Sequence, residues 1–288
     1  MRLPPRRTLI GLASLGLTGA MMLPVIYFSV VFRLSPPQPV AATSHVSPLV
    51  SDAIWARAGG GRATELKPVN PINMAQYVLC SERAQREHDE TLQRAARAEC
   101  ATYLPALAAL EYLSDLHLRD AGLEAAPFRR GHARLVTTIW LTRSWTKAEL
   151  IDTLAERGEF GLAFRGVEAA AQGYFGRAAA QLTLPQAALV AGFLGTRRPD
   201  AWCEPAAAAS LRHRVLEGMR DNDAIDEQAF GAADTSELSL AAPPATHQSC
   251  KGQDRLLTGR AGQAFPRVGV TGSSLDYADC RHRSSSSA

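Results

Sequence analysis

The residues best suited to chemistry are three arginines near the middle of the chain, Arg129, Arg130 and Arg134. A guanidinium group presents its N–H donors in a rigid planar fork, so it can bind a phosphate group through two parallel hydrogen bonds. Three such groups close together could hold a diphosphate. The alternative is the basic face of a surface helix, because the whole chain is rich in arginine. The residues themselves leave both interpretations open.

Cysteines form the second group of reactive residues, at positions 80, 100, 203, 250 and 280. Outside the cytoplasm thiols tend to oxidise, so Cys80–Cys100 and Cys250–Cys280 are candidate disulfides and Cys203 is left over. A metal site would instead need cysteine and histidine together. The two sets that could supply it are Cys80, His88 and Cys100, or His247, Cys250, Cys280 and His282. Neither set has the paired short spacings of a structural zinc site, so we predict no metal there.

The elements that must position these residues make up one domain of ordinary size. Of the 288 residues 46% are hydrophobic and 20% are charged, which excludes a wholly disordered chain. With 31 Lys and Arg against 28 Asp and Glu, the formal net charge of +3 is too small to indicate a nucleic-acid partner. Between residues 74 and 230 apolar residues recur every three or four positions, which predicts helices. Capping boxes at Thr146–Glu149 and Thr183–Gln186 mark two helix starts. The predicted fold class is therefore all-α.

An apolar run precedes this domain. Residues 9–32 carry no charge, and about 20 such residues span the hydrocarbon core of a bilayer. Arg2, Arg6 and Arg7 precede the run, so the positive-inside rule places residues 1–8 in the cytoplasm and the domain beyond the membrane. The alternative is a cleaved signal peptide with small residues at Val40–Ala42, although the apolar run exceeds the usual 7–15 residues. We expect an uncleaved transmembrane anchor over 9–32.

Two further segments flank the predicted domain of residues 71–230. Residues 33–70 begin with a proline-rich stretch and remain polar, which predicts an irregular linker. Residues 231–288 are rich in Ser, Gly, Pro and Thr and end in four serines, which predicts a disordered tail.

The order of motifs within the helical region resembles glycosyltransferase family 51, the peptidoglycan glycosyltransferases of monofunctional transglycosylases and class A penicillin-binding proteins. The family pattern runs close to FGxGxxGIEAAAxxYFGK and then LTLxEAALLAG. The corresponding residues here are Phe160, Gly161, Gly166, Glu168, Tyr174, Phe175 and Gly176, followed by the segment 182–192. Segments 141–151 and 212–219 resemble two further family helices, and the match is firm over residues 130–230.

This resemblance implies a lysozyme-like helical domain that polymerises the disaccharide-peptide of lipid II into glycan strands. In the family one Glu deprotonates the acceptor hydroxyl, while a second Glu and basic residues support the departing lipid diphosphate. The chemistry needs a base near the acceptor and positive charge on the leaving group. Arg129, Arg130 and Arg134 could hold that diphosphate through bidentate contacts.

Several catalytic positions of the family differ here. Its RKxxE motif falls on residues 130–134, where Gly131 replaces the Lys and Arg134 replaces the Glu. Its LYLN motif becomes Leu154-Ala155-Glu156, Ala163 replaces a glycine, and no GGSTITQQ stretch occurs upstream. The candidate for the base motif EDxxFxxHxG is the segment 81–88, with Glu82 as the base and Arg83 in place of the Asp. The alternative is that Glu82 is a solvated carboxylate on a helix.

Two other enzyme classes fit less well. Ser144–Lys147 matches the SxxK of penicillin-binding transpeptidases, but the SDN and KTG signatures are absent and the segment coincides with the predicted helix cap. A lytic transglycosylase with Glu82 as a lone acid is supported by nothing else in the order of motifs.

Two hypotheses result. The first is a divergent peptidoglycan glycosyltransferase of the inner membrane, with its C-terminal domain in the periplasm and Glu82 as base. The second is a non-catalytic relative that binds lipid II or the nascent glycan strand, or acts as a scaffold for other wall-synthesis proteins. The residues indicate no cofactor, although the family's use of a divalent metal leaves a cation open.

Overall fold

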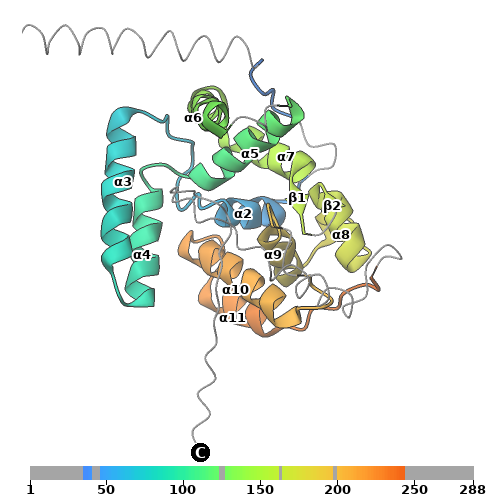
Figure 1. Cartoon of the computed structure of the whole chain (residues 1–288). Coiled ribbons are helices and arrows are strands. Elements are labelled where there is room, and N and C mark those ends of the chain that lie inside the picture. Colours follow the sequence, from blue (N-terminus) through green and yellow to red (C-terminus); the bar gives the residue numbers. More distant parts are fainter. Residues whose placement is uncertain (1–34, 41–45, 123–126, 162–163, 197–199, 244–288) are drawn as a thin grey trace, which may run out of the picture.

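A computed structural model describes residues 35–40, 46–122, 127–161, 164–196 and 200–243. These residues are mostly helical, as the apolar spacing predicted (Figure 1). The N-terminal half contains α2 (Pro48–Arg57), α3 (Pro71–Arg86), α4 (Glu90–Ala101), α5 (Leu107–Asp120), α6 (Pro127–Ser144) and α7 (Lys147–Arg157). The C-terminal half contains β1 (Glu159–Phe160), β2 (Phe164–Arg165), α8 (Val167–Phe175), the 3-10 turn η1 (Ala179–Gln181), α9 (Leu184–Gly192), α10 (Pro205–Asp221) and α11 (Glu227–Thr235).

Helix α9 forms the centre of the core. Every residue from Gln186 to Gly192 is buried, and α2, α8, α10 and α11 all pack against this helix (Figure 1). A helix that is apolar on all sides is stable when neighbours cover it completely. At its start Pro185 lies in the first turn, where a missing N–H costs little, and the Thr183 N–H donates to Gln186 Oε1 at 3.1 Å. The predicted capping box is confirmed.

A short hairpin connects α7 to α8. Strands β1 and β2 pair antiparallel, with Glu159 opposite Arg165 and Phe160 opposite Phe164. Phe160 also forms a bridge with Leu194, which ties the hairpin to the end of α9. The all-α prediction did not include this hairpin, because two-residue strands are too short to show an alternating pattern.

Helix α2 corrects the prediction of an irregular linker over residues 33–70. Ser47 caps this helix by accepting from the Val50 N–H at 3.3 Å, and Pro48 occupies the first turn. Ala53, Ile54 and Trp55 are buried against the core. The ten-residue helix has almost no amphipathic pattern because neighbours cover it on several sides, so periodicity could not reveal it.

The predicted boundary at residue 231 is also wrong. Helix α11 continues to Thr235, and the chain then crosses back over the domain. The Ala241 N–H donates to the Tyr174 carbonyl at 2.8 Å, and Trp202 Nε1 donates to the Ala241 carbonyl at 2.9 Å. Leu238 and Leu240 pack against the core. The Ser- and Pro-rich composition hid these two leucines; residues 244–288 lie outside the described part.

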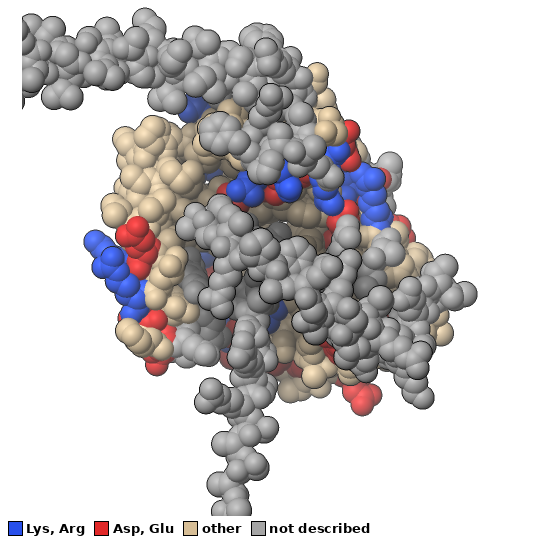
Figure 2. Space-filling view, in the orientation of Figure 1, with Lys and Arg blue, Asp and Glu red and all other residues tan. Residues whose placement is uncertain are grey.

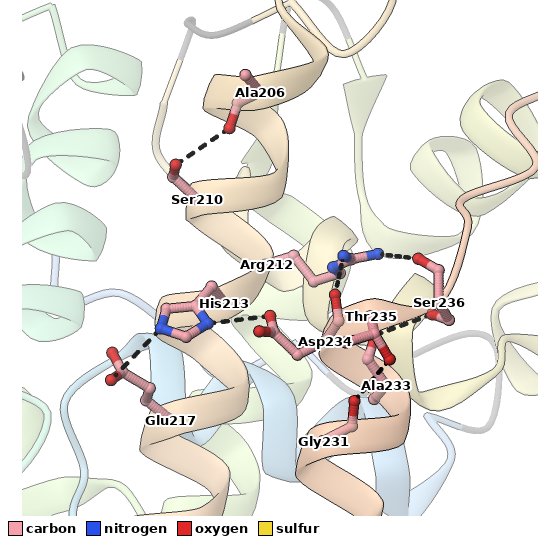
Figure 3. A network of polar contacts seen from close by, with 10 residues as sticks. All are labelled: Ala206, Ser210, Arg212, His213, Glu217, Gly231, Ala233, Asp234, Thr235 and Ser236. Atoms are coloured by element: carbon pink, nitrogen blue, oxygen red, sulfur yellow. Dashed lines mark hydrogen bonds and ion pairs between the residues drawn. The ribbon is translucent and has the colours of Figure 1, made fainter.

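A polar network fastens α10 to this returning segment (Figure 3). The buried Arg212 guanidinium donates to the Ser236 carbonyl at 2.8 Å and to the Asp234 carbonyl. Burial lowers the pKa of Arg212, and the nearby Asp234 carboxylate offsets only part of that shift. His213 lies between Asp234 at 3.0 Å and Glu217 at 3.5 Å. The network therefore joins two helices and the chain that follows them.

The Cys80–Cys100 disulfide predicted from sequence is confirmed, with the two Cα atoms 5.4 Å apart. It joins α3 to α4 and excludes the metal site that would have used both thiols. Cys203 is also disulfide-bonded, so the interpretation that left it over is wrong. Cys250 and Cys280 lie outside the described residues.

The predicted anchor, residues 9–32, lies outside the described residues as well. Within the part that the structure describes, no helix combines the length and apolarity needed to cross a bilayer.

Candidate functional site

Two of the three arginines predicted to bind a diphosphate share one carboxylate. Arg130 approaches Asp115 Oδ1 with both Nε and Nη2 at 3.3 Å, and Arg134 Nη1 lies 3.5 Å from Asp115 Oδ2. The arginines lie one turn apart on α6, and Asp115 projects from α5. Arg129 lies in the first turn of α6, and its side chain is outside the described part.

The α5–α6 interface fixes this arrangement. Next to Asp115, the buried Ser114 hydroxyl donates to the Leu110 carbonyl at 2.8 Å and lies 3.0 Å from Thr138 Oγ1. Thr138 follows Arg134 by one turn of α6. A buried hydroxyl pair holds its partners because leaving either group unpaired costs about 1–3 kcal/mol. The position of Asp115 opposite the arginines is therefore set by buried contacts beneath it.

The three charged side chains remain accessible to solvent. The exposed fractions are 42% for Arg130, 31% for Arg134 and 24% for Asp115. Ion pairs at such partly exposed positions contribute about 0–1 kcal/mol each. The guanidinium groups are thus partly open to solvent, and weak ion pairs hold the carboxylate beside them.

Glu82 lies elsewhere, on the outer surface of α3. Its side chain is 58% exposed and its carboxylate is 3.9 Å from Arg86 Nη2, one helical turn away. Near the start of α3 the Val69 N–H donates to Thr142 Oγ1 at 3.1 Å, which places that end beside α6. Glu82 lies roughly eleven residues, or about 17 Å, further along α3. Among the described contacts, the structure does not bring Glu82 together with Arg130 or Arg134.

Two glycines matched to the family adjoin the strands of the hairpin, Gly161 after β1 and Gly166 after β2. Gly161 has φ +74°, and a Cβ placed there would lie 2.0 Å from the Tyr174 hydroxyl oxygen. Gly166 has φ +86° and precedes α8, with its Cβ position 3.0 Å from the Glu156 carbonyl. Both positions favour glycine, because the backbone has a positive φ and because a side chain would have too little room.

The paired aromatics belong to the core. Tyr174 is fully buried, stacked against Phe193 at 4.9 Å and Trp202 at 5.1 Å, with Phe164 edge-on at 5.0 Å. Phe175 is also buried. These side chains hold α8, α9 and the hairpin together by aromatic packing.

The remaining family-matched residues terminate α8 and support the turn after it. Gly176 ends α8 in the left-handed conformation, with its N–H donating to the Gln172 carbonyl at 2.8 Å. The Glu168 carboxylate accepts from the Ala179 N–H at 2.9 Å, at the start of η1. In this geometry Glu168 orders the backbone that follows the helix.

Further charged residues lie in a band over α5, α7 and the β hairpin, where Figure 2 shows Lys and Arg interspersed with Asp and Glu. Arg119 pairs with Glu159 at 3.4 Å, and Arg157 pairs with Asp120. The Glu159 N–H donates to the Tyr112 hydroxyl at 2.8 Å. Burial raises the pKa of Tyr112, the Glu159 backbone hydrogen bond opposes that shift, and the hydroxyl stays protonated at neutral pH. Arg119 and Arg157 in this band are therefore each paired with a carboxylate.

One arginine is enclosed near the core. Arg57 donates to the Gly192 and Leu194 carbonyls at 3.3 and 3.2 Å, at the C-terminal end of α9. A cation there is favoured because the last carbonyls of a helix are unpaired. Burial, followed by the charge of Arg214, lowers the pKa of Arg57 to about 10. Arg57 thus pairs with carbonyl groups at the end of the central helix.

Metal binding finds no support in the described side chains, among which no cluster of three or more His, Cys, Asp or Glu residues could hold an ion.

Comparison with known proteins agrees with the motif order. Residues 120–220 match the family model described as Transglycosylase. A biosynthetic peptidoglycan transglycosylase of Acinetobacter baumannii is 40% identical over 67 residues, which are 23% of this chain and 30% of the relative. One of a Marinomonas species is 43% identical over 65 residues, 22% of this chain and 29% of the relative. Penicillin-binding protein 1A of Pseudomonas aeruginosa is 29% identical over 107 residues, 37% of this chain and 13% of the relative.

These matches confirm the resemblance to the peptidoglycan glycosyltransferases of family 51, over the segment that contains α6 to α10. The alignments cover less than a third of the length of these relatives. The mostly helical structure is consistent with the helical domain that the resemblance implies.

Asp115 is the residue of this site that sequence reasoning missed. It lies outside the family-matched motifs, on a helix whose apolar pattern gave no functional signal. Asp115 is distant in sequence from Arg130 and Arg134, and its contact with them depends on the packing of α5 against α6. Sequence patterns therefore could not predict this contact.

Proposed function

We propose that this chain is a membrane-anchored, peptidoglycan glycosyltransferase-like protein that binds lipid II or the nascent glycan strand. In this proposal Arg130 and Arg134 bind the diphosphate, and Glu82 does not act as a general base. The protein polymerises lipid II poorly or not at all and serves wall synthesis as a binding or scaffold subunit.

The observation that carries the proposal is the separation of the two predicted groups. The family-matched residues Gly161, Gly166 and Tyr174 make close-packed contacts around α8. The carboxylate assigned as base is exposed and ion-paired with Arg86, while the arginines pair with Asp115. A general base must reach the hydroxyl proton that it removes while the leaving group is held in place, so carboxylate and cations must share one site.

Two observations support the proposed location beyond the inner membrane. The apolar run over residues 9–32 is long enough to span a bilayer. The Cys80–Cys100 disulfide is typical of oxidising compartments such as the periplasm.

The direct test of ligand binding uses full-length protein in lipid nanodiscs titrated with fluorescent lipid II. We expect saturable binding by the wild type, and a loss of at least about tenfold in affinity for Arg130→Gln/Arg134→Gln. Each guanidinium–phosphate contact is a charge-assisted hydrogen bond, about twice as strong as a neutral one, and tenfold corresponds to about 1.4 kcal/mol.

The matched control is Arg83→Gln/Arg86→Gln, which removes two exposed charges from α3. We expect its affinity to stay within about twofold of the wild type. Equal losses in both double variants would mean that lipid II is attracted by net charge alone, and the proposed site would then be wrong.

A further inference from the structure

We propose that Asp115 is an intramolecular competitor for the anion site formed by Arg130 and Arg134, a role that rests on the proposed diphosphate-binding function. In the ligand-free protein the Asp115 carboxylate occupies the arginine pair, and an incoming diphosphate must displace it. Asp115 thereby sets the affinity of the site and keeps weakly binding anions out.

The geometry of the contact resembles that of a bound anion. One carboxylate oxygen faces Arg130 Nε and Nη2 at 3.3 Å, and the other faces Arg134 Nη1 at 3.5 Å. One group therefore accepts from both arginines, as two oxygens of a phosphate would. A ligand phosphate cannot take these donors while Asp115 keeps them.

The contact is strong enough to matter and weak enough to be displaced. All three side chains are partly solvated, with exposed fractions between 24% and 42%. Two partly exposed ion pairs together reduce the affinity of a competing anion by at most about thirtyfold, and by about three- to tenfold at the middle of that range. A diphosphate carries more charge and more acceptor oxygens than a carboxylate, so it can overcome this reduction.

Asp115 keeps this position because of the contacts beneath it. The buried Ser114 hydroxyl lies 3.0 Å from Thr138 Oγ1, which fixes the register of α5 against α6. Removal of the Asp115 charge should therefore free the arginines and leave the two helices in place.

Nearby ion pairs offer a matched comparison. On the same helix Asp120 pairs with Arg157 of α7. Substitution at Asp120 removes an equal charge from α5 and leaves Arg130 and Arg134 untouched.

The experiment is calorimetric titration of the full-length, detergent-solubilised protein with inorganic pyrophosphate. We expect Asp115→Asn to bind pyrophosphate about three- to tenfold more tightly than the wild type, and Asp120→Asn to stay within about twofold. Asp115→Glu retains a carboxylate and should keep most of the competition. A residue with a merely structural role would weaken binding, or leave it unchanged, when substituted.

The outcomes separate this inference from the proposed function. If Asp115→Asn binds no more tightly than the wild type while Arg130→Gln/Arg134→Gln loses pyrophosphate, the competitor role is wrong and the anion site stands. If the double arginine variant binds pyrophosphate like the wild type, the anion site itself is wrong. Asp115→Ser gives the same test with a smaller side chain should Asp115→Asn fold poorly.

Discussion

At the scale of single residues, Gly161 combines two constraints that no other residue type meets. Its φ of +74° belongs to the left-handed region, and its Cβ position would lie 2.0 Å from the Tyr174 hydroxyl oxygen. The tyrosine ring is held in place, because it is buried and stacked against both Phe193 and Trp202. The resemblance identified this glycine as a family position, and the structure supplies the physical reason for it.

Substitution of Gly161 should therefore destabilise the domain strongly. We expect Gly161→Ala to lower the free energy of unfolding by about 2–4 kcal/mol, from backbone strain and overpacking together. Gly176→Ala is the control, since that glycine has φ +63° but nothing within 4 Å of its Cβ position. It should cost about 1–2 kcal/mol. Urea unfolding measures both, and equal losses would show that the contact with Tyr174 contributes nothing.

At the scale of elements, two helices begin with the same capping device but different chemistry. On α7 the Glu149 carboxylate accepts from the Thr146 N–H at 2.7 Å, while Thr146 Oγ1 accepts from the Glu149 N–H at 3.2 Å. On α9 the neutral Gln186 takes the place of the glutamate. Both helix starts were predicted from sequence, because a capping box is a local pattern.

The α7 cap should depend on pH and the α9 cap should not. The hydrogen bonds from the Thr146 backbone and side chain hold the pKa of Glu149 below its ordinary 4.5. A lowered folded-state pKa means that the stabilisation is present above pH 4.5 and is lost as the pH falls through the folded value. We expect Thr146→Ala to cost about 1 kcal/mol at pH 7 and less at pH 3.

Thr183→Ala is the matched control and should cost about 1 kcal/mol at both pH values, since glutamine does not titrate. Urea unfolding at pH 7 and pH 3 measures the four differences. A Thr146→Ala effect that is the same at both pH values would contradict the role of the ionised Glu149.

Helices α3 and α4 form a pair with little buried surface of its own. Among the described residues of α3, Ala84 is buried. By contrast, Ile72 is 71% exposed and Leu79 is 59% exposed. On α4, Leu92 is 57% exposed. Periodicity identified the helix but could not show which of its sides has a neighbour.

The Cys80–Cys100 disulfide should therefore stabilise this pair locally. For a closed loop of about 20 residues the chain-entropy model gives about 3 kcal/mol. We expect Cys80→Ser/Cys100→Ser to increase hydrogen exchange of α3 and α4 amides by tenfold or more, with α9 amides unchanged. Equal acceleration in α9 would mean that the pair unfolds together with the core.

At the scale of the whole molecule, the sequence indicated the helical domain, one disulfide and the family resemblance, since each depends on local patterns or motif order. It did not indicate α2 or the return of residues 236–243 over the core. Both lie in proline- and serine-rich sequence, and their order comes from tertiary contacts such as the Ala241–Tyr174 hydrogen bond. The contact of Asp115 with Arg130 and Arg134 could not be predicted either, because it also depends on tertiary packing, here of α5 against α6.

The whole structure thus combines close packing of the family-matched residues with predicted catalytic groups that lie apart. Family-matched glycines and aromatics pack around α8, while Glu82 lies on the surface of α3 and the arginines pair with Asp115. This combination supports the proposal that the protein binds a lipid-linked diphosphate and polymerises it poorly or not at all.

The most direct measurement of that claim is a polymerisation assay with fluorescent lipid II, using purified full-length protein beside a Glu82→Gln variant. We predict little or no glycan polymer from the wild type and no difference in the variant, together with saturable lipid II binding by both. Abundant polymer from the wild type that disappears in Glu82→Gln would contradict the account, because Glu82 would then act as the catalytic base.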